Sequence, residues 1–185
     1  MLQWLPSCAP VRVAEVGVGS GCVALSILAE RPLARVVASD VSQRALDVAA
    51  ANARRLRVES QLELRLGSVL EPMEGMKFDA VVSNPPYIAD GDPTVDGAVN
   101  AHEPHVALYS GCAQDALKVA REVIAQASQA LRAGGWVAVE VGWRSAAEAC
   151  DAMRAHGLVD VAALKDFAGI ERVVVARRTL RRSEH

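Results

Sequence analysis

Residues 11–21 read VRVAEVGVGSG, and this stretch decides the fold class. Apolar residues dominate residues 12–16, which predicts a buried strand that ends at a glycine cluster. The glycines let the backbone turn tightly and bring its N–H groups against a ligand. Residues 22–30 are rich in Ala and Leu and precede a proline, which predicts a helix that ends there. The stretch therefore has the strand, glycine turn and helix order of a ligand-binding α/β unit.

The spacing of the glycines narrows the class of ligand. Gly17, Gly19 and Gly21 follow the pattern G-x-G-x-G. A nicotinamide dinucleotide site has G-x-G-x-x-G, and Cys22 occupies the third glycine position of that pattern. The spacing fits a nucleoside or amino-acid ligand better than a pyrophosphate. The alternative is a tight strand-to-helix turn that binds nothing.

The rest of the chain alternates short apolar runs with Ala/Leu-rich stretches, which predicts a mostly parallel sheet with helices on both faces. Further strands are expected at residues 35–39, 62–66, 78–83, 136–141, 160–165 and 172–176. Further helices are expected from Ser42, as N-cap, to about residue 57, and at residues 114–131 and 145–156. Gly134 and Gly135 are expected to end the second of these helices. The last two strands follow one another without a helix, so they are expected to form an antiparallel hairpin.

Composition excludes several classes of protein. With 185 residues, 51% hydrophobic and 23% charged, the chain is expected to fold as one domain, residues 1–185. A net charge of −2 and 4% aromatic residues argue against a nucleic-acid surface. No apolar run reaches membrane-spanning length, no signal peptide is visible, and the four cysteines lack zinc-ligand spacing. We expect a cytoplasmic protein with no membrane association and no metal site.

Two further elements carry chemistry. Asp40 closes the second strand, where a carboxylate accepts hydrogen bonds from both hydroxyls of a ribose. Asn84, Pro85, Pro86 and Tyr87 follow the strand at residues 78–83. The prolines leave local carbonyls free as acceptors, so one of these and the Asn84 carbonyl can hold both hydrogens of a planar NH2 group. Tyr87 offers a flat face for that group. We expect this segment to lie beside the glycine loop, because ligands bind at the carboxyl ends of such strands.

These motifs resemble a known family. EVGVGSG (15–21), Asp40 and SNPPYI (83–88) are similar to class I S-adenosylmethionine-dependent methyltransferases that modify planar amide or amine nitrogens. HEPHVALYSG (102–111) and KDFAGIERVVVARR (165–178) resemble the protein-(glutamine-N5) methyltransferases that modify peptide-chain release factors. The resemblance implies a Rossmann-like sheet of about seven strands and S-adenosyl-L-methionine as cofactor. It also implies a glutamine-bearing protein as substrate.

The resemblance also assigns roles to residues. It implies that Glu15 and the loop of Gly17, Val18, Gly19, Ser20 and Gly21 bind the methionine part of the cofactor. Asp40 would bind the ribose, and Ser68 and Val69 would lie beside the adenine. Asn84, Pro85, Pro86 and Tyr87 would hold the glutamine side chain, with Asn84 also next to the cofactor.

The chain departs from the family pattern at several points. Members usually have Asp at the positions of Glu15 and Ser68, and an Arg where Asn100 and Ala101 stand. Members also carry an N-terminal helical domain that recognises the substrate, which we expect to be absent here, so recognition would rely on a partner or activator subunit. Two other readings stay open: an adenine-N6 methyltransferase of RNA or DNA, and a degenerate, non-catalytic scaffold.

Overall fold

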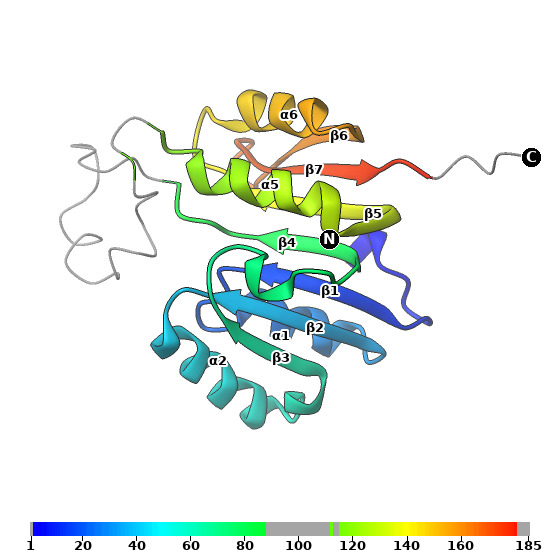
Figure 1. The fold of residues 1–185 in the computed structure, drawn as a ribbon, viewed down its shortest axis with the longest axis vertical. Helices are drawn as coiled ribbons and strands as arrows, with labels where there is room; N and C mark the ends of the chain where they lie inside the picture. Colours follow the sequence, from blue (N-terminus) through cyan, green and yellow to red (C-terminus); the bar gives the residue numbers. More distant parts are fainter. Residues whose placement is uncertain (1, 88–111, 113–114, 181–185) are drawn as a thin grey trace, which may run out of the picture.

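The computed structural model describes residues 2–87, 112 and 115–180. Its centre is a seven-stranded sheet with the strand order β3-β2-β1-β4-β5-β7-β6 (Figure 1). The strands are β1 (Val11–Val16), β2 (Ala34–Asp40), β3 (Leu62–Leu66), β4 (Phe78–Ser83), β5 (Leu131–Glu140), β6 (Leu158–Lys165) and β7 (Glu171–Arg178). The α-helices are α1 (Cys22–Glu30), α2 (Gln43–Leu56), α5 (Lys118–Ala130) and α6 (Ala146–Ala155). Three short 3-10 helices are η1 (Leu2–Trp4), η2 (Glu59–Gln61) and η3 (Glu71–Met73).

The sheet is parallel from β3 to β5 and antiparallel at its other edge. Strand β1 pairs in parallel with both β2 and β4, so the strand order reverses between β1 and β4. Strand β7 pairs antiparallel with β5 and with β6, which confirms the predicted C-terminal hairpin. The reversal places the carboxyl ends of β1 and β4 side by side, where α/β sheets bind ligands.

Helices cover both faces of the sheet, as the sequence predicts. On one face, buried residues of α5 and α6 pack against the sheet around Phe78, Val81 and Val137. On the other face, buried residues of α1 and α2 pack against the sheet around Val13 and Val36. Figure 1 shows α5 in front of the strands and α1 behind them.

Local sequence signals set the ends of the first two helices. Gly21 precedes α1 with a φ of 86°, a left-handed conformation that glycine adopts without strain. Ser42 caps α2 as predicted, because its hydroxyl accepts a hydrogen bond from the Ala45 N–H at 3.3 Å. Among the described residues, no helix is both long enough and apolar enough to cross a membrane.

One predicted boundary is wrong. The helix expected over residues 114–131 begins at Lys118, and β5 begins directly after it at Leu131. Gly134 and Gly135 therefore lie inside β5 and do not end the helix. A side chain at Gly135 would approach the Asp79 carbonyl oxygen to 3.0 Å, so the glycine allows β5 to lie close to β4.

Candidate active site at the carboxyl edge of the sheet

The candidate site lies where the sequence predicts it, between the ends of β1 and β4. The Ser83 hydroxyl at the end of β4 donates a 2.9 Å hydrogen bond to the Val16 carbonyl of β1. An added Cβ at Gly17 would lie 3.8 Å from the Asn84 carbonyl oxygen. The glycine loop and the segment that starts at Asn84 are therefore neighbours, although 65 residues of sequence separate Gly17 from Ser83.

The glycine loop is held by its neighbour β2. The N–H groups of Gly17 and Val18 both donate to the Ser39 carbonyl, at 2.9 and 3.0 Å. Gly17, Gly19 and Gly21 have φ values of 72°, 53° and 86°, which residues with side chains rarely adopt. An added Cβ at Gly19 would meet no atom of the described residues within 4 Å, so the loop faces open space there.

Asp40 is fixed against the same loop by two backbone groups. Its Oδ2 accepts a 2.9 Å hydrogen bond from the Gly19 N–H, and its Oδ1 accepts one of 2.9 Å from the Ser42 N–H. An ionised carboxylate has about four acceptor positions, so each oxygen retains one for a ligand. The side chain is thus oriented at the carboxyl edge of the sheet, as a ribose acceptor would need to be.

Glu15 is buried beneath the loop with an incomplete set of partners. The residue is 3% exposed, and its Oε2 has no hydrogen-bond partner among the described residues. Burial raises the pKa of this carboxyl from 4.5 to about 8; the backbone N–H of Ala24 lowers it and the charge of Asp40 raises it further. A buried carboxyl with one unpartnered oxygen at the base of a glycine loop fits a cationic ligand group, because a nearby positive charge favours the ionised form that burial disfavours.

Ser68 and Val69 are tied to the end of β2. The Ser39 hydroxyl donates a 2.5 Å hydrogen bond to the Val69 carbonyl, and the Gly67 N–H donates one of 3.0 Å to the Asp40 carbonyl. Val69 is buried with a φ of 48°, whereas Ser68 is half-buried. Both residues therefore lie near Asp40, and Ser68 supplies a hydroxyl where a carboxylate was expected from the family pattern.

The Asn84–Tyr87 segment leaves the sheet between β4 and β5. Asn84 is exposed, Pro85 is buried, and Pro86 and Tyr87 are half-buried. Tyr87 packs against Gly142: an added Cβ there would lie 3.4 Å from Tyr87 Cδ2 and 3.3 Å from its carbonyl oxygen.

Three residues that position the site were missed in the sequence. Gly142 leaves room for Tyr87, and the buried hydroxyls of Ser39 and Ser83 connect neighbouring strands. Ser39 and Ser83 lie at the ends of apolar runs, which is a signal that would have found them, whereas the contact of Gly142 with Tyr87 has no signal in the sequence. The predicted block at residues 102–111 and the positions Asn100 and Ala101 lie outside the described residues.

The strand order, the glycine loop and the edge carboxylate define a class I methyltransferase fold. The chain belongs to the methyltransferase small domain family, whose model matches residues 1–101.

Several curated relatives share one specific name. The chain is 42% identical to a release factor glutamine methyltransferase of Xylella fastidiosa, over 95% of this chain and 63% of the relative. It is 37% identical to a protein of the same name from Koribacter versatilis, over 90% of this chain and 58% of the relative. The chain thus spans about three fifths of the length of these relatives.

Solved structures share the fold at low sequence identity. A methyltransferase from Pyrococcus furiosus matches with a TM-score of 0.71 and 16% identity, over 95% of this chain and 78% of that structure. The ribosomal protein L11 methylase of Lactobacillus delbrueckii subsp. bulgaricus matches with a TM-score of 0.64 and 20% identity, over 92% of this chain and 72% of that structure. These similarities confirm the predicted sheet architecture.

Proposed function

We propose that this chain transfers a methyl group from S-adenosyl-L-methionine to the side-chain amide nitrogen of a glutamine in a substrate protein. We propose further that the substrate is a peptide-chain release factor. The observation that carries the proposal is the position of Asn84–Tyr87 beside the glycine loop. That position would bring a planar amide next to a cofactor bound at the loop. The names of the curated relatives support the choice of substrate.

The residues of the loop fit the proposed cofactor. Glu15 would face the cationic methionine part, because its Oε2 lacks a partner among the described residues. Gly19 borders open space, and Asp40 retains acceptor positions for the ribose hydroxyls. Ser68 and Val69 would lie on the adenine side of Asp40. The cofactor, when bound, supplies an electrophilic methyl group on a sulfonium.

The substrate amide would be held by the Asn84–Tyr87 segment. An amide nitrogen is a poor nucleophile because its lone pair is delocalised into the carbonyl group. The Asn84 side-chain oxygen and a proline carbonyl would accept its two N–H groups, and the Tyr87 ring would lie against its flat face. Such a grip would turn the nitrogen lone pair toward the methyl group, so that the N–C bond forms as the S–C bond breaks. S-adenosylhomocysteine would be the leaving group, and the methylated nitrogen would then lose its proton to water. Orientation of this kind supplies roughly 7–11 kcal/mol of a barrier in well-aligned reactions.

A protein substrate is favoured over nucleic acid by the charge of the chain. Its net charge of −2 supplies no general attraction to phosphates. Its aromatic content of 4% supplies few stacking surfaces for bases. Recognition by an additional domain or partner subunit, and a cytoplasmic location with the translation machinery, are part of the same proposal.

The decisive test compares methylation with cofactor binding. In single-turnover methylation of a purified release factor, Asn84→Ala should lower the rate about a hundredfold. Calorimetric titration with S-adenosylhomocysteine should show little change in affinity. Tyr87→Ala should also slow methylation. Tyr87→Phe retains the aromatic ring and should methylate at close to the wild-type rate. Gln43→Ala, on the exposed side of α2, is the control for substitution alone.

The outcomes separate the three readings. Wild-type rates in Asn84→Ala would overturn the proposed grip on the amide. A wild-type protein that binds S-adenosylhomocysteine but methylates only adenine in an oligonucleotide would favour the nucleic-acid reading. No measurable binding of S-adenosylhomocysteine would favour the non-catalytic scaffold.

A further inference from the structure

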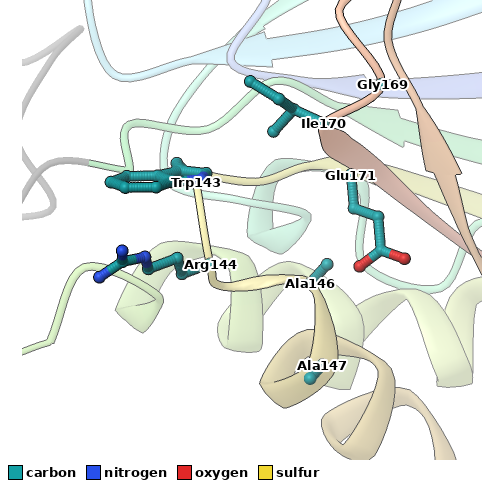
Figure 2. Close-up of a pocket in the computed structure, with 7 residues that line it drawn as sticks. All are labelled: Trp143, Arg144, Ala146, Ala147, Gly169, Ile170 and Glu171. Carbon is teal, nitrogen blue, oxygen red and sulfur yellow. The ribbon is translucent and has the colours of Figure 1, made fainter.

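A surface hollow lies at the same edge of the sheet as Asn84–Tyr87. Its volume is about 310 Å3. It is lined by Trp143 and Arg144 after β5, by the first residues of α6, and by Gly169, Ile170 and Glu171 before and at the start of β7 (Figure 2). We call this surface the Trp143 hollow. None of its residues has a role in the site described above.

The Trp143 hollow is directly continuous with the proposed substrate site. Gly142 packs against Tyr87, and Trp143 is the next residue in the chain. The Val141 N–H donates a 2.8 Å hydrogen bond to the Arg172 carbonyl, which joins the end of β5 to the start of β7. The hollow therefore begins one residue away from the residue that packs against Tyr87, within reach of residues that flank a glutamine held there.

Trp143 is held in an exposed position. Its side chain is 61% exposed, and the Arg144 guanidinium lies 3.9 Å from the centroid of its ring. Arg144 has a φ of 70°, a conformation that costs free energy for a residue with a side chain. Backbone strain of this kind concentrates at binding and catalytic sites. Trp and Arg are also the residues that dominate the affinity of protein interfaces.

The opposite wall of the hollow is a hydrogen-bonded turn that exposes a second aromatic residue. The Oδ1 atom of Asp166 accepts hydrogen bonds from the N–H groups of Ala168 (2.8 Å) and Ile170 (2.9 Å). The Asp166 N–H donates to the Ile170 carbonyl at 2.8 Å, which closes the turn. Phe167 lies within this turn and is fully exposed. A turn fixed by its own hydrogen bonds thus holds an apolar ring in solvent, two residues before the Gly169 that lines the hollow.

We propose that the Trp143 hollow and Phe167 bind the segment of the protein substrate that flanks the target glutamine, through an apolar side chain of that segment. This inference rests on the proposed function, because it takes the glutamine-bearing protein as the occupant. The charges favour a polypeptide over a nucleic acid. Arg144 and Glu171 both line the hollow, and the Arg172 guanidinium lies 3.7 Å from the Asp166 carboxylate of the adjacent turn, so the surface offers no net positive charge to a phosphate backbone.

The test measures the affinity for a purified bacterial release factor in the presence of S-adenosylhomocysteine. Trp143→Ala and Phe167→Ser should each weaken this affinity about tenfold or more, as removal of an interface anchor does. In steady-state methylation, KM for the release factor should rise while kcat stays close to the wild-type value. The calorimetric affinity for S-adenosylhomocysteine should remain within about twofold of wild type, because no residue of the hollow is placed at the cofactor. Leu33→Ala serves as the matched control. Leu33 is an apolar residue between α1 and β2 and is 51% exposed.

The outcomes distinguish failure of this inference from failure of the proposed function. If the wild type methylates the release factor and both variants bind it as tightly as Leu33→Ala does, the inference is wrong and the function stands. If the wild type neither methylates nor binds the release factor, both are wrong. If the variants lose affinity for a single-stranded RNA but not for the release factor, the surface binds nucleic acid and the inference is again wrong.

Discussion

Replacement of Glu15 by glutamine should make the free energy of unfolding less dependent on pH between pH 5 and pH 8. Burial raises the pKa of this carboxyl from 4.5 to about 8, so the folded chain holds a proton that the unfolded chain releases. This contribution to stability is fully present below pH 4.5 and is lost as the pH rises toward 8. Glutamine has nearly the same shape as glutamate and does not titrate. The Glu15→Gln variant should therefore not lose this contribution to stability as the pH rises.

The expected magnitude follows from the size of the pKa shift. One pKa unit corresponds to about 1.36 kcal/mol. Between pH 5 and pH 8 the wild type should lose about 3–4 kcal/mol of unfolding free energy relative to Glu15→Gln. For a domain whose total stability is about 5–15 kcal/mol, a change of this size is readily measured.

Urea unfolding followed by circular dichroism at pH 5, 6, 7 and 8 provides the measurement. Wild type and Glu15→Gln should converge in stability near pH 5 and diverge steadily above it. Glu59→Gln removes one negative charge from an exposed position and should give a curve parallel to that of wild type. If wild type and Glu15→Gln instead differ by a constant amount from pH 5 to pH 8, Glu15 ionises normally in the folded chain and the reasoning is refuted.

Three other substitutions test the site and the core. Asp40→Ala should weaken S-adenosylhomocysteine binding by about 1.5–3 kcal/mol, because a charged acceptor is lost. A dissociation constant within twofold of wild type by calorimetry would contradict this. Ser68→Asp should tighten binding of the same ligand, since a carboxylate accepts a hydrogen bond from the adenine amine more strongly than a hydroxyl does. A lower affinity with an intact circular dichroism spectrum would show that Ser68 does not face the adenine. Phe78→Ala should reduce the unfolding free energy by about 3–5 kcal/mol, because Phe78 is completely buried under α5, whereas the exposed Leu33→Ala should change it little.

Local sequence determined the elements that begin and end on local signals. Residues 22–30, 62–66 and 78–83 were predicted with the bounds that the structure has, because glycine, proline and apolar periodicity act over a few residues. Ser42 was recognised as a cap for the same reason, since its acceptor role depends only on the next helical turn. The absence of a helix between the last two runs also predicted their antiparallel pairing.

The tertiary structure alone decided what depends on contacts between distant segments. Gly134 and Gly135 resemble a helix stop in sequence, but Gly135 lies beside Asp79 of β4 and Gly134 beside Arg177 of β7, so both are part of a strand. The family pattern placed Glu15 at the cofactor, yet only the packing of β1 between two strands and below α1 removes its carboxyl from water and raises its pKa to about 8. Gly142 carries no signal for contact with Tyr87, because 54 residues separate the two and their contact arises only from the pairing of β4 with β5. Burial and proximity of this kind are sums over many residues of the folded chain, so no single stretch of sequence contains them.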